Sequence, residues 1–412
     1  MSLLHLCMLA CFALAVREAQ AEVRCEKVNN YKDVVECAEK HSPEVQKAES
    51  TWAEKSARVE SATQLTNPDL SLQSVSGSLD SERKTETDVA LTFPIELGGK
   101  RSARKQLASV EAARAQSDIY RAKSEVRREV YLKLLRLRHI QQEIELVDES
   151  IETFTKLVKQ YEGRPARSPE QDVSLTVFKI AKSEYGFKRS EYEQELAAVE
   201  MYFQVTTGLN LDSLKKVSMP EIKSWPVSAS PNGDLKKSPL AAAYEFDVQS
   251  ARGAWDGEKA DSWPTVNIGP SAKFTNESGR ELQQWGFNLS MPIPLFNANG
   301  AGRAAAQASV QSSERKQELA LKQLEADRKL FSNLYNKAVL SLKDSPSSTS
   351  LEGKHKKIES LFFKGLVPSS LVIESHRSLV EFEKTRNSHE LKALNSLFNI
   401  QMIAGETIGV SL

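Results

Sequence analysis

Two acidic residues lie at the same distance from two glycines. Asp172 follows Gly163 by nine residues, and Glu374 follows Gly365 by the same interval. Carboxylates that gather around an opening favour cations, so we take Asp172 and Glu374 as candidates for an acidic, cation-selective ring built from several copies of the chain. The alternative is an ordinary acidic residue near a helix N-terminus, where the helix dipole favours negative charge.

Four basic residues lie near the same two glycines. In an assembly they would form ion pairs between neighbouring segments, which makes the surroundings of Gly163 and Gly365 a candidate gate. Exposed ion pairs contribute less than about 1 kcal/mol each, so a gate of this kind would open easily. Ordinary solvated charges are the alternative for each of them: Arg164, Arg167, Lys364 and Arg377.

The other residue patterns predict no catalysis. The run Gly300-Ala301-Gly302-Arg303-Ala304-Ala305 satisfies a dinucleotide fingerprint, but the segment before it alternates polar and apolar residues, unlike a strand buried on both faces. The six histidines have no metal-ligand spacing, and no nucleophile motif or carboxylate pair is evident. The sequence therefore predicts that the chain is not an enzyme and holds no cofactor and no resident metal.

The charge balance also excludes a class of partner. Lys and Arg together number 55, and so do Asp and Glu, so no overall field attracts nucleic acid. The length of 412 residues exceeds that of one small domain and favours a duplicated architecture.

The first residues predict an exported protein. An apolar run from Leu3 to Ala15 precedes Ala19-Gln20-Ala21, which is typical of a signal peptide over 1–21; an uncleaved anchor is the alternative. The mature chain keeps two cysteines, Cys25 and Cys37. In an oxidising compartment they could close a short loop, and two free thiols are the alternative.

The remaining sequence contains an internal repeat of two similar halves. Pro43 and Pro239, each after a serine, lie 196 residues apart, and Pro68 and Pro264 lie the same distance apart. We therefore expect a first repeat over 22–208, a linker over 209–236 and a second repeat over 237–412.

Each repeat contains one hairpin of alternating polar and apolar residues. The pattern predicts strands over about 67–78 and 85–94, and again over about 264–275 and 283–293. Four strands are too few to close a barrel, whereas three chains would supply twelve, with one apolar face for lipid. A water-soluble sandwich edge is the alternative. The expected lipid-facing residues are Val89, Leu91, Phe93, Trp285, Phe287 and Leu289.

Each hairpin is followed by two long helical stretches. Apolar residues from Leu137 to Val158 recur at alternating steps of three and four, which is the heptad pattern of an antiparallel coiled coil. We expect helices over about 98–162 and 168–207, then over about 302–364 and 369–404. Ser168-Pro169-Glu170-Gln171 predicts a capped helix start, and Pro346 interrupts the second rod.

This order of elements resembles the TolC-type outer-membrane factors of efflux and secretion systems. The segments 93–101, Phe-Pro-Ile-Glu-Leu-Gly-Gly-Lys-Arg, and 292–297, Pro-Ile-Pro-Leu-Phe-Asn, are similar to the heavy-metal branch. The resemblance implies a mainly α fold with a small membrane β part, in which a homotrimer forms a 12-stranded β-barrel on an α-helical barrel.

The same resemblance implies a function and partners. The chain would be an outer-membrane channel subunit with a periplasmic tunnel, docking an inner-membrane RND pump through a periplasmic adaptor and exporting heavy-metal cations or other small toxic solutes. In the family an acidic ring lies near Glu374. The tyrosine and arginine that latch the closed tunnel are replaced here by Phe362 and Val367, so a latch would use other residues.

Two other functions remain as alternatives. A periplasmic adaptor would carry one helical hairpin between the halves of a small β domain, and not a tandem repeat. A coiled-coil structural protein would need neither a leader nor strands.

Overall fold

The computed structural model describes residues 25, 28–79, 82–217, 225–226, 234–346 and 348–408. The signal peptide expected over 1–21 lies outside the described residues, as does half of the expected linker, 218–224 and 227–233. The chain forms two compact units, and each takes segments from both repeats. The first comprises Met1–Lys47, Ala122–Gly233 and Ala326–Leu412, and the second comprises Ala48–Arg121 and Asp234–Glu325.

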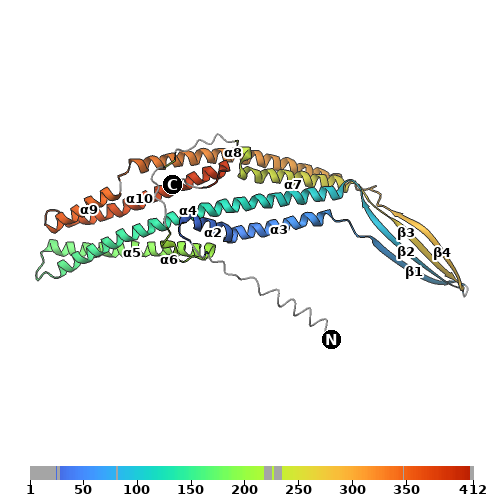
Figure 1. Cartoon of the computed structure of the whole chain (residues 1–412), viewed down its shortest axis with the longest axis horizontal. Coiled ribbons are helices and arrows are strands. Elements are labelled where there is room, and N and C mark those ends of the chain that lie inside the picture. Colours follow the sequence, from blue (N-terminus) through green and yellow to red (C-terminus); the bar gives the residue numbers. More distant parts are fainter. Residues whose placement is uncertain are drawn as a thin grey trace, which may run out of the picture. The chain divides into compact units, whose positions relative to one another are not determined.

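The expected elements are present, with shifted bounds. The first hairpin is β1 (Asp69–Leu79) and β2 (Glu82–Glu96), and the second is β3 (Thr265–Glu277) and β4 (Arg280–Ser290). The long helices are α4 (Lys100–Glu162), α5 (Pro169–Thr207), α8 (Gly300–Asp344) and α10 (Ser369–Ala404). The mainly helical fold with antiparallel strands is confirmed (Figure 1).

The structure differs from the expected rods in two places. One helix is expected over 302–364, but α8 ends at Asp344 and α9 covers Ser348–Phe363, because Pro346 lacks the N–H that a continuous helix needs. Helices precede both hairpins, α3 (Pro43–Thr63) and α7 (Pro239–Asp261), with α2 (Tyr31–His41) before α3. The expected linker region contains the short α6 (Leu211–Lys215) and a 3-10 turn, η1 (Leu235–Lys237).

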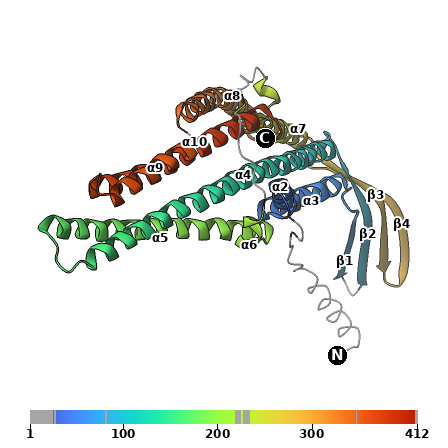
Figure 2. The ribbon, with the colours of Figure 1, turned by 60° about the vertical axis from the view of Figure 1, so that its left-hand side comes forward.

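In the second unit the four strands form one antiparallel sheet in the order β1-β2-β3-β4 (Figures 1 and 2). The central pair, β2 and β3, joins the first repeat to the second. Within the described chain, the outer edges of β1 and β4 have no strand partner.

The two faces of this sheet differ in polarity. Leu70 lies opposite Leu91, Leu72 opposite Val89, and Ala272 opposite Trp285, so these side chains share a face. Leu70, Leu72 and Leu91 are exposed, and Trp285 keeps 79% of its surface accessible. All six residues expected to face lipid lie on this apolar face, because alternation along β2 and β4 places them there.

Glycine is required at two positions of this unit. A Cβ on Gly269 of β3 would lie 1.9 Å from the carbonyl oxygen of Leu91, so only glycine permits this approach of β3 to β2. Gly98, between β2 and α4, has a φ of +71°, and a Cβ there would lie 2.6 Å from Cδ1 of Trp263. Gly269 therefore allows β3 to approach β2, and Gly98 allows the turn from β2 into α4 to pack against Trp263.

The helices of the second unit are linked side by side by ion pairs. Lys55 on α3 binds Glu111 on α4 at 2.8 Å, and Arg114 on α4 binds Asp247 on α7. Arg252 on α7 then binds Glu314 on α8 at 2.7 Å. The helix order α3, α4, α7, α8 therefore matches the strand order.

The first unit holds the apolar core that the heptad pattern predicts. Leu137, Ile140, Val147 and Phe154 of α4 are buried, and they share a cluster with Phe178, Tyr185 and other side chains of α5. A second cluster joins α8 and α10 through residues such as Tyr335, Val339, Leu394 and Phe398. The coiled-coil seam is thus the scaffold that positions the tips of the helices.

Candidate functional site: the helix tips and the buried polar network

The two helix tips of the first unit lie beside each other. One is the turn from Gly163 to Ser168, and the other is the turn from Lys364 to Pro368. The hydroxyls of Ser174 and Ser369 are 3.3 Å apart. A groove of about 560 Å³ runs between the tips, and its lining includes Tyr161, Arg164, Phe362, Phe363 and Val367.

The first tip is held by contacts within itself. Nε of Arg167 lies 2.6 Å from Oδ1 of Asp172, and the Arg164 guanidinium lies 4.5 Å from the centre of the Tyr161 ring. Ser168 and Gln171 form the expected capping box at the start of α5. Asp172 is 58% exposed, so its carboxylate stays accessible despite its partner.

The second tip is linked to the first repeat. Gly365 has a φ of +73° and follows the end of α9, where Lys364 is exposed. Arg377 lies 3.6 Å from Glu374 on its own helix and 3.6 Å from Glu184 on α5. The contact with Glu184 joins α10 to α5, and Glu374 is 62% exposed.

Of the two positions that differ from the pattern of the resembled family, Phe362 makes aromatic contacts and Val367 lines the groove. The rings of Phe362 and Phe178 meet edge to face with centroids 6.2 Å apart, and Phe362 also packs against Phe363. Phe362 therefore contributes packing between the repeats at a position where a tyrosine would supply a hydroxyl.

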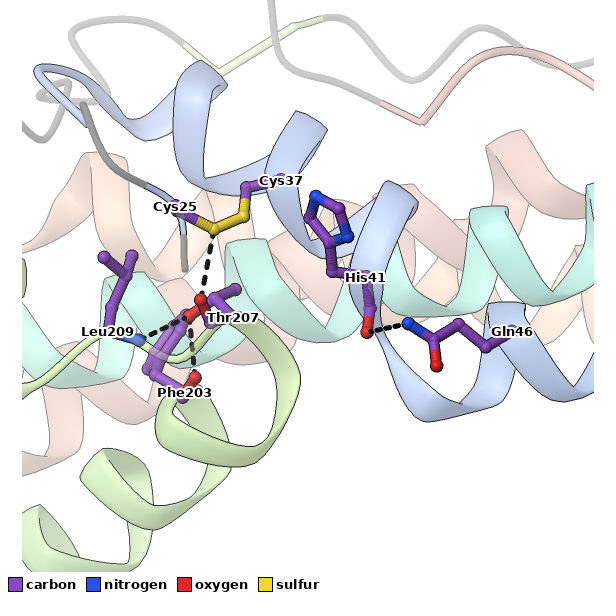
Figure 3. The surroundings of a disulfide bond; sticks show 7 residues. All are labelled: Cys25, Cys37, His41, Gln46, Phe203, Thr207 and Leu209. Carbon is purple, nitrogen blue, oxygen red and sulfur yellow. Dashed lines mark hydrogen bonds between the residues drawn. A yellow bond between two sulfur atoms is a disulfide. The ribbon is translucent and has the colours of Figure 1, made fainter. Parts of the chain in front are cut away.

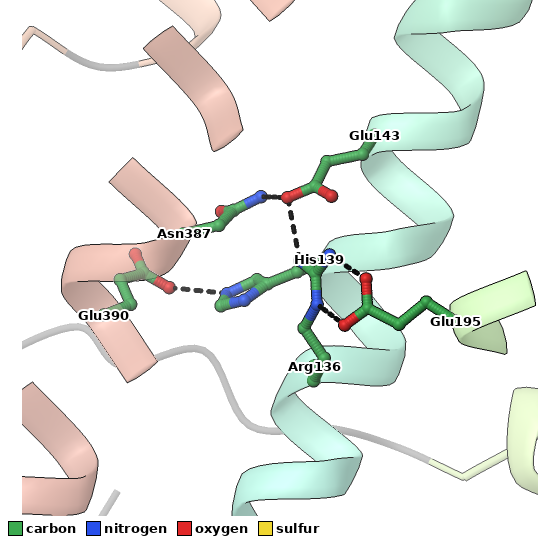
Figure 4. Close-up of polar contacts among 6 residues, drawn as sticks. All are labelled: Arg136, His139, Glu143, Glu195, Asn387 and Glu390. Atoms are coloured by element: carbon green, nitrogen blue, oxygen red, sulfur yellow. Dashed lines mark hydrogen bonds and ion pairs between the residues drawn. The ribbon is translucent and has the colours of Figure 1, made fainter. Parts of the chain in front are cut away.

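A buried polar network joins α4 to α5 and α10, and the sequence interpretation missed it (Figure 4). Arg136 of α4 donates to both oxygens of Glu195 on α5, at 2.7 and 2.5 Å, and to Glu143 at 2.9 Å. Asn387 of α10 donates to the same Glu143 oxygen at 2.8 Å. Glu143 is 1% exposed, so Arg136 supplies the charge that compensates this buried carboxylate.

These contacts shift two pKa values in opposite directions. The hydrogen bonds from Arg136 lower the pKa of Glu195, although burial raises it. Burial lowers the pKa of Arg136, but the hydrogen bonds with Glu195 and Glu143 raise it by more, so the pKa of Arg136 lies above its usual range. Both groups are therefore charged at neutral pH.

Two histidines are buried near this network. Nε2 of His139 lies 3.0 Å from Oε2 of Glu390, and both Arg138 and Arg386 lie within 4 Å of that carboxylate. Burial raises the pKa of Glu390, but these partners lower it more, so it lies below its usual value. Further along, His376 contacts Ser150 at 2.9 Å and Glu359 at 3.0 Å.

The sequence did contain a signal for this network. Arg136, His139 and Glu143 recur at steps of three and four immediately beside the apolar seam. Polar residues at that spacing face a neighbouring helix if the seam is flanked by helices on both sides. The histidines lack metal-ligand spacing, so their sequence pattern alone indicates no metal site.

Cys25 and Cys37 form a disulfide in the first unit (Figure 3). Their Cα atoms are 6.2 Å apart, and Sγ of Cys25 contacts the carbonyl oxygen of Thr207 at 3.1 Å. The bond fastens the segment before α2 to α2 itself, next to the C-terminal end of α5.

Neither a metal cluster nor a membrane-spanning helix is found in the parts of the chain that the structure covers. No three His, Cys, Asp or Glu side chains of the described residues gather where they could hold an ion. None of the helices in those ranges is both long enough and apolar enough to cross a bilayer.

Comparisons with known proteins support one family. No family model matches the chain. The cobalt-zinc-cadmium resistance protein CzcC of Cupriavidus metallidurans is 24% identical over 234 residues, so the chain spans about half (53%) of the length of this curated relative.

Solved structures share the fold over nearly the whole chain. A membrane protein from Pseudomonas aeruginosa has a TM-score of 0.72 with 12% identity, covering 96% of both chains. The outer membrane protein VceC of Vibrio cholerae has a TM-score of 0.69 with 14% identity, covering 92% of this chain and 97% of VceC. CusC, described with transmembrane channel formation, has a TM-score of 0.66 with 15% identity, covering 95% and 96%. These likenesses confirm the resemblance inferred from the repeats and favour its heavy-metal branch: this chain has the fold of the TolC-type outer-membrane efflux proteins.

Proposed function

We propose that this chain is the outer-membrane channel subunit of a tripartite, RND-type efflux system. Three copies form a duct that exports heavy-metal cations or other small toxic solutes. The observation that carries the proposal is the four-stranded sheet, which has one apolar face and two unpaired outer edges among the described strands. No catalytic step is part of this role.

The sheet supports a closed ring of copies. Backbone groups at an open strand edge cannot be left unpaired in lipid, so β1 of one copy must pair with β4 of the next. Such head-to-tail contacts close into a ring if the rotation between copies allows it. Three copies give twelve strands, an even number within the range of bilayer barrels, with Trp285, Phe287 and Phe93 toward lipid.

The helix tips support docking of a periplasmic adaptor. The groove between the tips is flanked by exposed apolar side chains, and Phe363 and Leu366 are 56% and 67% exposed. An adaptor that presents a helical hairpin would bury these side chains in that groove. The ion pairs of Arg167 and Arg377 are exposed and weak, so docking could exchange them at low cost and open the tips.

The cargo assignment rests on the relative and on charge. The curated relative is named for resistance to cobalt, zinc and cadmium. Asp172 and Glu374 are exposed carboxylates at the two tips, and in a trimer each would form a ring of three that favours cations at the periplasmic entrance.

The alternatives fit the chain less well. A periplasmic adaptor would place one helical hairpin within one β domain. Here, two repeats each supply a β-hairpin to one sheet. A coiled-coil structural protein gives no reason for an exposed apolar sheet face.

Deletion of the gene, with complementation, tests the proposed function. The deletion strain should become sensitive to zinc, cobalt or cadmium, and the protein should fractionate with the outer membrane. Drugs, copper and silver in the same screen distinguish other cargoes. Unchanged tolerance to every metal would overturn the cargo assignment, and recovery of the protein in the soluble cytoplasm would overturn the channel itself.

A further inference from the structure

One row of long side chains crosses the polar face of the sheet. Gln73 lies opposite Asp88, Asp88 opposite Lys273, and Lys273 opposite Gln284, so these four residues from four strands lie at one level. Side chains alternate between the faces of a strand, so this row points away from the apolar face that carries Val89 and Trp285.

A second acid lies in the next row on the same face. Glu86 lies two residues before Asp88 on β2 and therefore on the same face, diagonally across from Lys273. Nζ of Lys273 lies 2.6 Å from Oε2 of Glu86, and Nζ of Lys84 lies 3.0 Å from Oε1 of Glu86. The four charges of Lys84, Glu86, Asp88 and Lys273 sum to zero. We call Gln73, Glu86, Asp88, Lys273 and Gln284 the charged belt.

The neighbouring row on the same face has short side chains. Ser71 lies opposite Ala90, Ala90 opposite Ser271, and Ser271 opposite Gly286. Rows on one face are separated by two residues, or about 7 Å. The polar face therefore changes from short to long, charged side chains within that distance.

We propose that the charged belt is an ion-selectivity constriction inside the strand part of the duct, and that Lys273 determines its specificity. The inference rests on the proposed function, because a ring of copies is needed to bring three belts around one lumen. In such a ring the long side chains narrow the lumen next to a wider level of short ones.

In this arrangement, Lys273 weakens the binding of cations to the neighbouring acids. Carboxylates are ligands for divalent cations, and three copies would place six of them, from Glu86 and Asp88, at adjacent levels. Lys273 binds Glu86 and lies opposite Asp88, so together with Lys84 it balances the charge of the acids through which exported cations pass. A divalent cation then leaves without being held, which conduction requires.

Single-channel recording of the full-length protein in planar bilayers tests the inference. In a KCl gradient, Lys273→Gln adds a net negative charge to each copy and should raise the permeability ratio of K⁺ to Cl⁻ about two- to three-fold, allowing for screening by salt. Added Co²⁺ should then block the current of this variant at concentrations that leave the wild-type current unchanged.

Two further variants keep the test decisive if Lys273→Gln fails to fold. The double variant Glu86→Gln/Asp88→Asn should shift the permeability ratio in the opposite direction. The charge-swapped variant Lys273→Glu/Glu86→Lys preserves the pair and should restore the wild-type ratio.

A matched control removes the same charge elsewhere. Lys322→Gln breaks an exposed pair with Glu318 on α8 and should leave the ratio and the response to Co²⁺ unchanged. Channels of Lys273→Gln or Glu86→Gln/Asp88→Asn that keep the wild-type ratio would overturn the belt and leave the duct intact. Wild-type protein that forms no channels would overturn the duct, and the belt with it.

Discussion

Arg136 and Glu195 join α4 to α5 through two parallel hydrogen bonds of 2.7 and 2.5 Å, and the same guanidinium compensates the buried carboxylate of Glu143. Loss of Arg136 would leave Glu143 charged and buried. The apolar seam and this polar contact therefore stabilise the same pair of helices by different means.

The variant Arg136→Met should lower the free energy of unfolding of the protein by about 3–5 kcal/mol, the cost of breaking a buried ion pair. Arg189→Met is the matched control, because Arg189 also links α5 to α4, through Asp148 at 2.7 Å, but both side chains are more than 40% exposed. The control should cost less than about 1 kcal/mol. Urea unfolding in detergent measures both; equal losses would contradict the role of the network.

Acid should destabilise the protein through Glu195 and Glu390. Contacts with Arg136 lower the pKa of Glu195, and the pKa of Glu390 is lowered by His139 and two arginines despite burial. A group with a lowered folded pKa stabilises the fold above its unfolded pKa, near about 4.3 for Glu, and that stability is lost as pH falls through the folded pKa.

The melting temperature should therefore fall as pH decreases below about 4.3. The double variant Glu195→Gln/Glu390→Gln should be less stable at pH 7 and show a shallower fall. A melting profile with the same slope in both proteins would show that other carboxylates control the acid sensitivity.

Gly269→Ala should disrupt the link between the two hairpins. The new Cβ would lie 1.9 Å from the Leu91 carbonyl oxygen, closer than any real contact, so β3 must move away from β2. Gly77→Ala on β1 is the control, because its Cβ would meet nothing within 4 Å. Resistance of the folded protein to heat and protease should fall only for Gly269→Ala; full resistance of that variant would show that the register is wrong.

Removing the disulfide should loosen the start of the chain. Cys25 and Cys37 are separated by 12 residues, and closing a loop of that size is worth about 3 kcal/mol in the chain-entropy model. Cys25→Ser/Cys37→Ser, or reduction of the wild-type protein, should lower the melting temperature. Free thiols found in the oxidised wild-type protein by mass spectrometry would contradict the bond.

The sequence predicts the parts of this fold that depend on local periodicity. The heptad seam from Leu137 to Val158 lies in the core, and the capping box at Ser168 starts α5 as expected. Alternation in β2 and β4 predicts that their apolar residues share one face, because a strand has a strict period of two, and the register of the sheet places them there.

The sequence leaves undetermined what depends on distant contacts. Pairing of β2 with β3 joins residues such as Val89 and Ala272, and no local pattern specifies it. Sequence patterns do not identify the polar network for a similar reason. His139 and Glu143 resemble solvated polar residues, and only their contacts with Glu390 and Asn387 of α10 show that they are buried. The bounds of helices differ from those expected where a proline interrupts the helix. At Pro346, one expected helix is divided into α8 and α9.

Copies of this chain should close into a ring in the outer membrane through the edges of β1 and β4. Native mass spectrometry of the full-length protein, extracted in detergent from isolated outer membranes, tests it most directly. The expected mass is that of three chains. A monomer, or an assembly with any other number of chains, would contradict it.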